Sequence, residues 1–275
     1  MSIGDFSSMP TVKRLSEFYY EHLKLTQKLI EYLFVKLKSN PNERVDVVYF
    51  LIFGLISTGQ SIIILAQSGK ITECFMLARS VVERIITILY LLICEDEEFE
   101  RFNVYTKQKA VRMMNREVEL KELKAVLKAS NYDEIINEPE IKEALGMFTS
   151  KRGKKITRWN KRSINQMLDV IAENGLDVEY LLLAVLAIYD EASEALHGTI
   201  YGSIFHTGVF TTGVPSEKSE LEKTWCSQLS MLLLSLGTCM SSLFKGINKK
   251  YPIEELVNES NSILKGIKRG KNAGN

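Results

Sequence analysis

The sequence predicts an all-α fold, a bundle of about eight to ten helices, from three observations. Apolar residues recur at steps of three and four along most of the chain, which is the period of an amphipathic helix. The five prolines fall where helix boundaries are expected. No alternation of apolar and polar residues is long enough to indicate a sheet. The 275 residues suffice for a sizeable core, and we expect a single domain over residues 1–275.

The first half of the chain predicts four long helices. In the first, His22 lies on the apolar face between Phe18 and Leu29. The segment 39–42, which contains a proline, ends this helix, and Gly69 separates the second from the third. The fourth is polar on nearly all sides, so we expect it to cover the bundle or to project from it. These predicted helices span residues 11–38, 44–67, 71–94 and 98–129.

The second half predicts shorter helices around one irregular region. Pro139 is placed for the first turn of a helix, and Gly175 for a helix stop. Glycines and β-branched residues over 198–213 indicate a loop or short strands. The predicted helices here begin near Pro139 and span residues 161–174, 177–197, 217–249 and 253–268. We expect the core within 44–248, and a C-terminal helix with a basic tail over 252–275.

Two uncharged stretches, residues 47–69 and 224–244, are long enough to cross a membrane. Both contain serine, threonine and glutamine, so we interpret them as buried bundle helices. The first thirty residues lack the apolar core of a signal peptide. Four cysteines without C-x-x-C spacing favour free buried thiols: Cys74, Cys94, Cys226 and Cys239. We therefore expect a cytoplasmic protein.

The net charge of +1 conceals a separation of charge along the chain. Residues 101–162 hold 16 Lys and Arg against 8 Asp and Glu, whereas residues 163–230 hold 2 against 10. Such segments can pair within the protein or between subunits, or attract a charged partner. We favour internal or subunit pairing, in a homo-oligomer or with a partner protein, over an external ligand.

The densest positive charge lies between residues 151 and 162. A cluster of cations beside an aromatic residue can bind phosphates and stack a base of a nucleic acid. The plainer interpretation is a solvated loop that complements the acidic segment after it. The residues concerned are Lys151, Arg152, Lys154, Lys155, Arg158, Trp159, Lys161 and Arg162.

Tyr189, Ser193 and His197 are spaced by four, so one helix carries all three on one side. His197 suits proton transfer near neutral pH, and Ser193 is one turn away. The alternative is a structural histidine that closes a buried hydrogen-bond network. Arg79 and Glu83 are also four apart among apolar neighbours, and they form either an ion pair or, near His197, a phosphate or carboxylate site. We expect the helices to bring these five residues and Trp159 together at one interior or cleft-lining site.

We expect no metal and no cofactor. Glu194 lies three residues before His197, which is the spacing of a ligand pair in di-iron helix bundles. Those sites need two such pairs, and neither His22 nor His206 has an acidic residue three positions before it.

Five short motifs, in a fixed order, resemble the bacterial helical family named domain of unknown function 5677. The likeness covers about residues 47–202. The motifs are Gly69-x-x-x-Glu73, Leu77-x-Arg79-Ser80-x-x-Glu83, Arg101-Phe102-x-x-Tyr105, Trp159 and Tyr189-x-x-x-Ser193-x-x-x-His197.

The chain is more loosely similar to helical proteins of the HEPN and abortive-infection type, many of which belong to bacterial defence or toxin systems. The resemblance implies an accessory or effector protein in phage defence or stress response, which binds a phosphate-bearing ligand or a partner protein. A metal-independent ribonuclease is one alternative, with His197 as acid–base. HEPN ribonucleases carry an arginine shortly before the histidine, and here Arg79 or the basic segment would have to supply that cation. A membrane-disrupting effector is the other alternative.

Overall fold

The computed structural model describes residues 9–39, 43–121, 123–213, 215 and 217–270. The chain divides into two compact units, where the sequence led us to expect one domain. Unit 1 combines residues 1–93 with 164–275, and unit 2 is residues 94–163. The all-α prediction is confirmed, with one small two-stranded sheet added. Residues 40–42, expected to end the first helix, and the tail beyond 270 lie outside the described residues.

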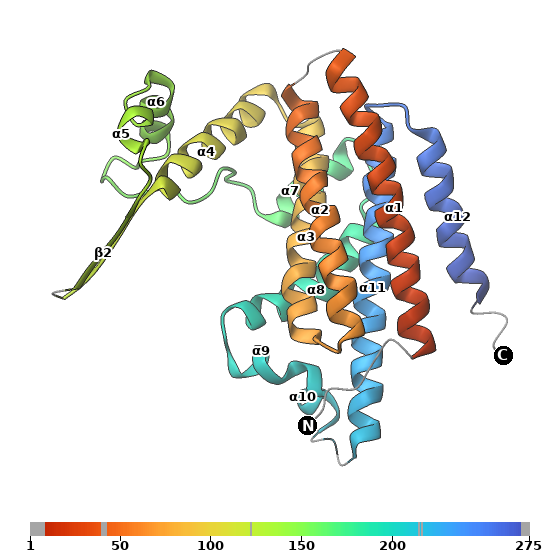
Figure 1. The fold of residues 1–275 in the computed structure, drawn as a ribbon. Coiled ribbons are helices and arrows are strands. Elements are labelled where there is room, and N and C mark those ends of the chain that lie inside the picture. Colours follow the sequence, from red (N-terminus) through yellow and green to blue (C-terminus); the bar gives the residue numbers. More distant parts are fainter. Residues whose placement is uncertain (1–8, 40–42, 122, 214, 216, 271–275) are drawn as a thin grey trace. The chain divides into compact units, whose positions relative to one another are not determined.

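Unit 1 is built from long helices that run alongside one another (Figure 1), with short helices between α8 and α11. The helices predicted for this unit all form, with ends within three residues of those predicted. Its elements are α1 (Pro10–Ser39), α2 (Glu43–Gln67), α3 (Ile71–Ile93), α7 (Ile164–Glu173), α8 (Glu179–Leu196), α9 (Ile200–Ile204), the 3-10 helix η2 (Phe205–Thr207), α10 (Val209–Thr212), α11 (Lys218–Asn248) and α12 (Glu254–Gly270).

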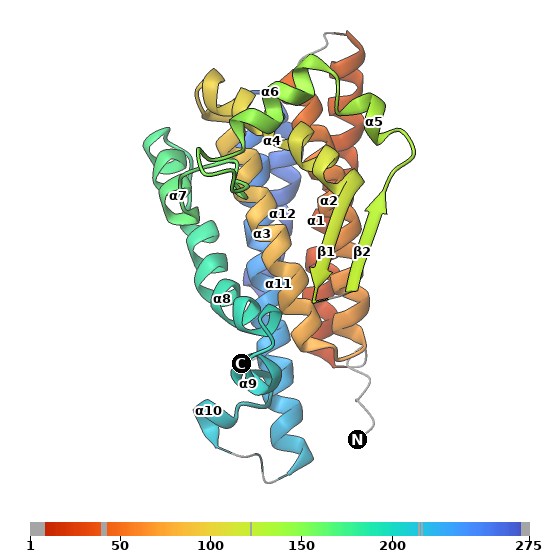
Figure 2. The ribbon, with the colours of Figure 1, turned by 90° about the vertical axis from the view of Figure 1, so that its left-hand side faces the viewer.

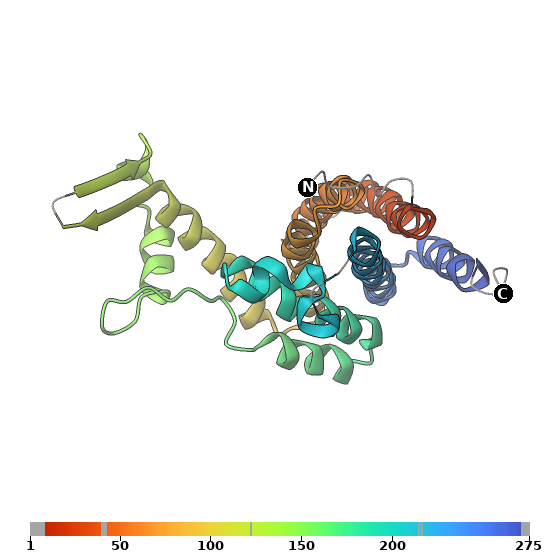
Figure 3. The same ribbon diagram turned by 90° about the horizontal axis from the view of Figure 1, so that it is seen from below.

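Helix α11 is the centre of unit 1. It contacts α1, α3, α8 and α12, and Figure 3 shows α1, α2 and α3 curving around it. Two glycines permit this close approach. A Cβ on Gly237 would collide with the ring of Phe18 in α1, and one on Gly246 would collide with Leu89 in α3. The apolar segment 224–244 is therefore a core helix, as predicted.

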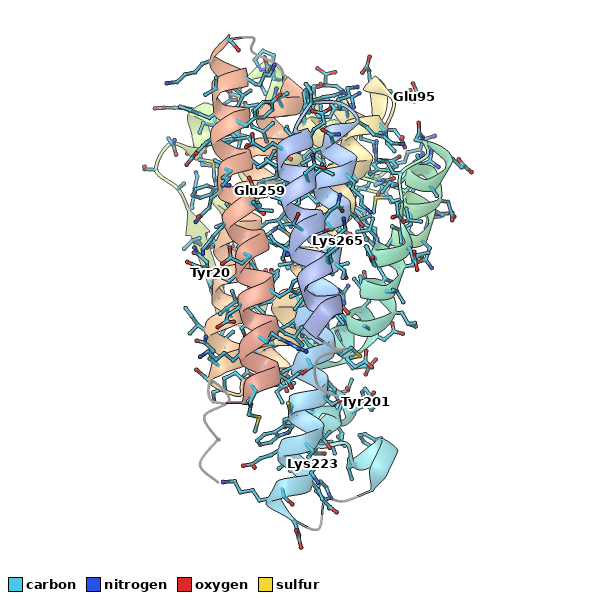
Figure 4. All side chains as sticks on the ribbon, turned by 90° about the vertical axis from the view of Figure 1, so that its right-hand side faces the viewer. Tyr20, Glu95, Tyr201, Lys223, Glu259 and Lys265 are labelled. Atoms are coloured by element: carbon cyan, nitrogen blue, oxygen red, sulfur yellow. The ribbon has the colours of Figure 1, made fainter. Side chains whose placement is uncertain are left out.

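Helix α12 packs on α1 and α11 and closes one side of unit 1. Figure 4 labels Glu259 on α12, whose carboxylate forms an ion pair of 2.7 Å with Lys28 of α1. Beneath this exposed pair lies a buried polar contact between Ser260 of α12 and Ser241 of α11. Both serines lie within hydrogen-bond distance of His22 in α1.

Unit 2 begins with α4 (Asp96–Met114) and continues as a β-hairpin instead of a longer helix. Strands β1 (Asn115–Leu120) and β2 (Leu123–Lys128) pair antiparallel, from Asn115 opposite Lys128 to Leu120 opposite Leu123, and lie side by side in Figure 2. The prediction of one helix over 98–129 is wrong. Charged and apolar residues alternate over 117–120, a period of two that suits a strand. Helices α5 (Tyr132–Ile135) and α6 (Pro139–Met147) complete the unit.

Residues 198–213 form the short helices α9, η2 and α10, not the predicted loop or strands. The hydroxyl of Thr199 accepts a hydrogen bond of 2.9 Å from the Gly202 N–H and so caps α9. Gly198, Gly208 and Gly213 have φ angles of 65°, 74° and 83°. These left-handed positions, which favour glycine, separate the helices from one another.

Candidate functional site

Three predicted polar residues converge between α3 and α8. The Arg79 Nε donates to Glu83 Oε1 at 2.9 Å, within one face of α3. The Nη2 of the same guanidinium donates to the Tyr189 hydroxyl of α8 at 3.0 Å. The guanidinium carbon also lies 4.1 Å from the centre of the Tyr189 ring, within cation–π range. We call Arg79, Glu83 and Tyr189 the α3–α8 cluster.

The α3–α8 cluster holds fixed charges. Burial acts to lower the pKa of Arg79, but the hydrogen bond and the charge of Glu83 outweigh it, so this pKa is raised. Partial burial and Glu83 raise the pKa of Tyr189 against the opposing effect of Arg79. The cluster therefore contains a permanent guanidinium and a neutral phenol at neutral pH. A phosphate would have to compete with Glu83 for the guanidinium, and we interpret the cluster as a polar connection between two helices.

Among the described residues, no recorded contact connects the side chain of His197 or Ser193 to the α3–α8 cluster. Helix α8 ends at Leu196, and the backbone N–H of His197 donates to the Ser193 carbonyl at 3.0 Å. His197 lies eight residues after Tyr189, about 12 Å along a helix axis. Its side chain is exposed, so the interpretation of His197 as a buried structural histidine is wrong. No contact recorded for the described residues connects its ring to Arg79.

The buried histidine of this protein is His22. Its side chain is fully buried, and its Nδ1 lies 3.0 Å from the Phe18 carbonyl oxygen. Its Nε2 lies 3.3 Å from the Ser260 hydroxyl and 3.4 Å from that of Ser241. Burial lowers the pKa of His22 to about 4, so the ring is neutral at physiological pH. In the sequence, His22 lies on the apolar face of a helix between Phe18 and Leu29, and that position is the signal of a buried network.

The basic segment, residues 151–162, is held by α4 of unit 2. Arg101 Nε donates to the Trp159 carbonyl at 2.7 Å, and the Tyr105 hydroxyl donates to the Thr157 carbonyl at 2.6 Å. The ring of Trp159 meets that of Phe102 edge to face, with centroids 5.0 Å apart. The motif Arg101-Phe102-x-x-Tyr105 and the distant Trp159 are therefore in direct contact.

The cations of the basic segment are largely unpaired. All seven are exposed, and Arg162 lies 3.3 Å from a carboxylate oxygen of Glu98. Within the part of the chain that the structure describes, no carboxylate partner is recorded for the remaining six. Desolvation and the charges of Lys109 and Arg112 lower the pKa of Lys155. Lys109 and Arg112 of α4 thus add to the positive charge around Lys155 of the basic segment.

Helix α2 has an apolar outer face. Phe50, Phe53 and Ile64 are 65%, 61% and 64% exposed. Two described helices are long and apolar enough to cross a membrane. Of the most apolar 18-residue stretch of each helix, 67% is buried in α11 and only 28% in α2. The interpretation as a buried bundle helix thus suits α11, whereas most of this stretch of α2 is not buried.

The structure also locates the residues of the metal and thiol predictions. Among the described residues, no group of three or more His, Cys, Asp or Glu side chains has the arrangement of a metal site. Cys74, Cys94 and Cys239 are buried, and Cys226 is half-buried.

Comparison with known families supports the resemblance seen in the sequence. Residues 45–211 match the model of DUF5677, described as a family of unknown function. No curated protein and no solved structure matches the chain. The looser likeness to HEPN proteins stays a prediction.

Proposed function

Because the chain belongs to the DUF5677 family, whose function is unknown, we propose a function from its own residues: the basic segment of unit 2 binds a phosphate-bearing polyanion. The observation that carries this proposal is the set of six exposed cations for which no carboxylate partner is recorded among the described residues. Unpaired cations on a segment anchored by Arg101 and Tyr105 keep their charge available to a ligand. A phosphate chain supplies the repeated negative charge that such a segment attracts.

Trp159 serves as an anchor in this proposal. Its ring packs against Phe102 and its carbonyl accepts a hydrogen bond from Arg101. We therefore assign phosphate binding to Lys151, Arg152 and their neighbouring cations, with little contribution from base stacking. An accessory or effector role in bacterial phage defence or stress response, in the cytoplasm, is the accompanying prediction from the family resemblance.

Salt dependence tests the proposal directly. Binding of a fluorescent single-stranded oligonucleotide is measured by anisotropy at increasing salt. If four to six phosphates are contacted, affinity falls about 50- to 300-fold between 50 and 200 mM salt, from a slope of about −0.7 per phosphate. The double variant Lys151→Gln/Lys154→Gln should reduce the slope by about 1.4. Binding that is independent of salt contradicts the proposal.

A matched control exists within the same unit. Lys124 pairs with Glu117 at 2.7 Å, and Lys128 pairs with Asp133 at 2.6 Å. Lys124→Gln/Lys128→Gln removes the same charge from lysines that already have partners, so its slope should stay close to that of the wild type. Equal slopes for the two double variants would show that the basic segment is not the site.

The ribonuclease alternative finds less support. It needs a cation near His197, and no contact recorded for the described residues joins the imidazole to Arg79. The same oligonucleotide made of RNA checks this point, because cleavage that disappears in His197→Ala would restore a catalytic role for His197.

The outer face of α2 supports a second candidate, association with a membrane surface. Exposed Phe50 and Phe53 on an uncharged helix segment are suited to insertion into the lipid interface. The variant Phe50→Ser/Phe53→Ser should then lose co-sedimentation with lipid vesicles. Leu182→Ser/Leu186→Ser, which changes exposed leucines of α8, should retain it. If the wild-type protein stays in the supernatant when the vesicles are pelleted, association with a membrane surface is refuted.

A further inference from the structure

A small cavity of unit 1 lies among α3, α8, α11 and the short helices between α8 and α11. Its volume is about 100 Å³, and four aromatic residues line it: Phe75, Tyr201, Phe205 and Phe210. Phe75 and Phe205 are buried, whereas Tyr201 and Phe210 are 39% and 56% exposed. Figure 4 labels Tyr201 beside the N-terminal half of α11. The cavity therefore has a buried aromatic floor and an aromatic mouth.

Two hydrogen-bond acceptors border the same cavity. They are the side chains of Glu191 from α8 and Gln228 from α11. Glu191 Oε2 and Gln228 Oε1 are both buried and have no hydrogen-bond partner among the described residues. The Gln228 amide nitrogen donates to the Phe205 carbonyl at 3.3 Å, which leaves the amide oxygen as the unused end. A buried acceptor without a donor is costly, most of all on a carboxylate.

The surroundings of the cavity are acidic. Burial raises the pKa of Tyr201, and the nearby charges of Glu191, Glu194 and Asp190 raise it further. Negative charge together with acceptor oxygens excludes an anion and favours a cation that donates hydrogen bonds. The faces of aromatic rings attract cations as well. The negative charge, the acceptor oxygens and the aromatic lining of the cavity therefore all favour a cationic ligand with N–H donors.

We propose that this cavity binds the ammonium group of a protonated primary amine. The ammonium donates to Glu191 Oε2 and Gln228 Oε1, and its alkyl chain lies against the rings of Tyr201 and Phe210. The volume equals that of roughly three molecules of liquid water, which suits an amine of a few heavy atoms. This site takes a cation in unit 1 and is independent of the polyanion site proposed for unit 2.

Three small probes separate the contribution of positive charge to binding from that of N–H donors. Butylammonium carries charge and N–H donors, tetramethylammonium carries charge without donors, and butan-1-ol is neutral. Titrations of ¹⁵N-labelled protein followed by NMR should show saturable shifts around Glu191 and Gln228 with butylammonium. Tetramethylammonium and butan-1-ol should bind about tenfold or more weakly, because each lacks either donors or charge. Equal affinity for butylammonium and butan-1-ol overturns the proposal.

Variants test the assigned residues. Glu191→Gln should weaken butylammonium about tenfold or more while the protein stays folded, because it removes the charge and keeps the shape. Glu179→Gln, at the exposed first turn of α8, is the matched control and should bind like the wild type. Unchanged affinity in Glu191→Gln refutes the site, and thermal unfolding of each variant verifies folding.

The source of the amine is resolved by a further probe, N-acetyl-lysine methylamide, which presents the same ammonium on a peptide unit. Binding of both compounds identifies a lysine side chain as an acceptable source. Binding of butylammonium alone identifies a free small amine. Binding of neither compound contradicts the proposal.

Discussion

Protonation of His22 should destabilise unit 1 as the pH falls. The imidazole is fully buried, and its neutral form satisfies the three polar atoms around it. With Nδ1–H donating to the Phe18 carbonyl, Nε2 is left to accept from a serine hydroxyl. A proton on Nε2 would turn this acceptor into a donor and place a charge among apolar side chains. Folding therefore favours the neutral ring.

The magnitude follows from the two pKa values. The pKa of His22 is 6.5 in an ordinary environment and about 4 in the folded protein. Between these values the unfolded chain binds more protons than the folded one, so the free energy of unfolding falls as the pH drops. The stability contributed by a neutral His22 is complete above about pH 7. About 2 kcal/mol of it is lost between pH 7.5 and pH 5, and about 3 kcal/mol below pH 4.

A difference measurement isolates this effect from the titration of carboxylates. The free energy of unfolding is obtained from urea titrations at several pH values for the wild type and for His22→Gln, which cannot gain a proton. The wild-type value minus the His22→Gln value should fall by about 2 kcal/mol from pH 7.5 to pH 5. His197→Gln, a change at an exposed histidine, controls for histidine replacement itself. A difference that is flat across this range refutes a depressed pKa for His22.

Two further changes test packing between helices. Tyr189→Phe removes the hydroxyl that accepts from Arg79 and should lower the free energy of unfolding by about 0.5–1.5 kcal/mol, and an unchanged urea midpoint would show that the cluster contributes nothing. Gly237→Ala forces a methyl group against Phe18 and should cost about 1–3 kcal/mol. Gly266→Ala, where nothing lies within 4 Å, should instead stabilise α12 by up to about 1 kcal/mol. Equal effects of the two glycine changes would argue against close packing of α11 on α1.

The long helices were predictable because each one needs an apolar face of period 3.6 and a clear stop. Gly175 illustrates the stop, since it lies two residues after the last residue of α7 and has a φ of 72°. Pro139 illustrates the start, because it occupies the first turn of α6. Such signals are local, so the sequence carries them without knowledge of the tertiary structure.

The hairpin was missed because its side chains carry no burial signal. Both strands are exposed along their whole length, so no buried face constrains the pattern. Val118 and Leu120 alternate with Glu117 and Glu119, but the same charged residues also form good helices. Pairing between the strands, including the ion pair of Lys124 with Glu117, decides the outcome, and such pairing depends on residues several positions apart.

The difference between local signals and contacts set by tertiary structure also explains why only Arg79, Glu83 and Tyr189 of the predicted site converged. Steps of four place residues on one helix face, but each step of 400° overshoots a full turn by about 40° and advances about 6 Å. Tyr189 and His197, two steps apart, therefore differ by about 80° around the axis and 12 Å along it. A stripe of this length cannot meet a single side chain. Arg79 contacts Tyr189 because α3 passes α8 at that point, and only the packing of a second helix determines where along the stripe that contact occurs.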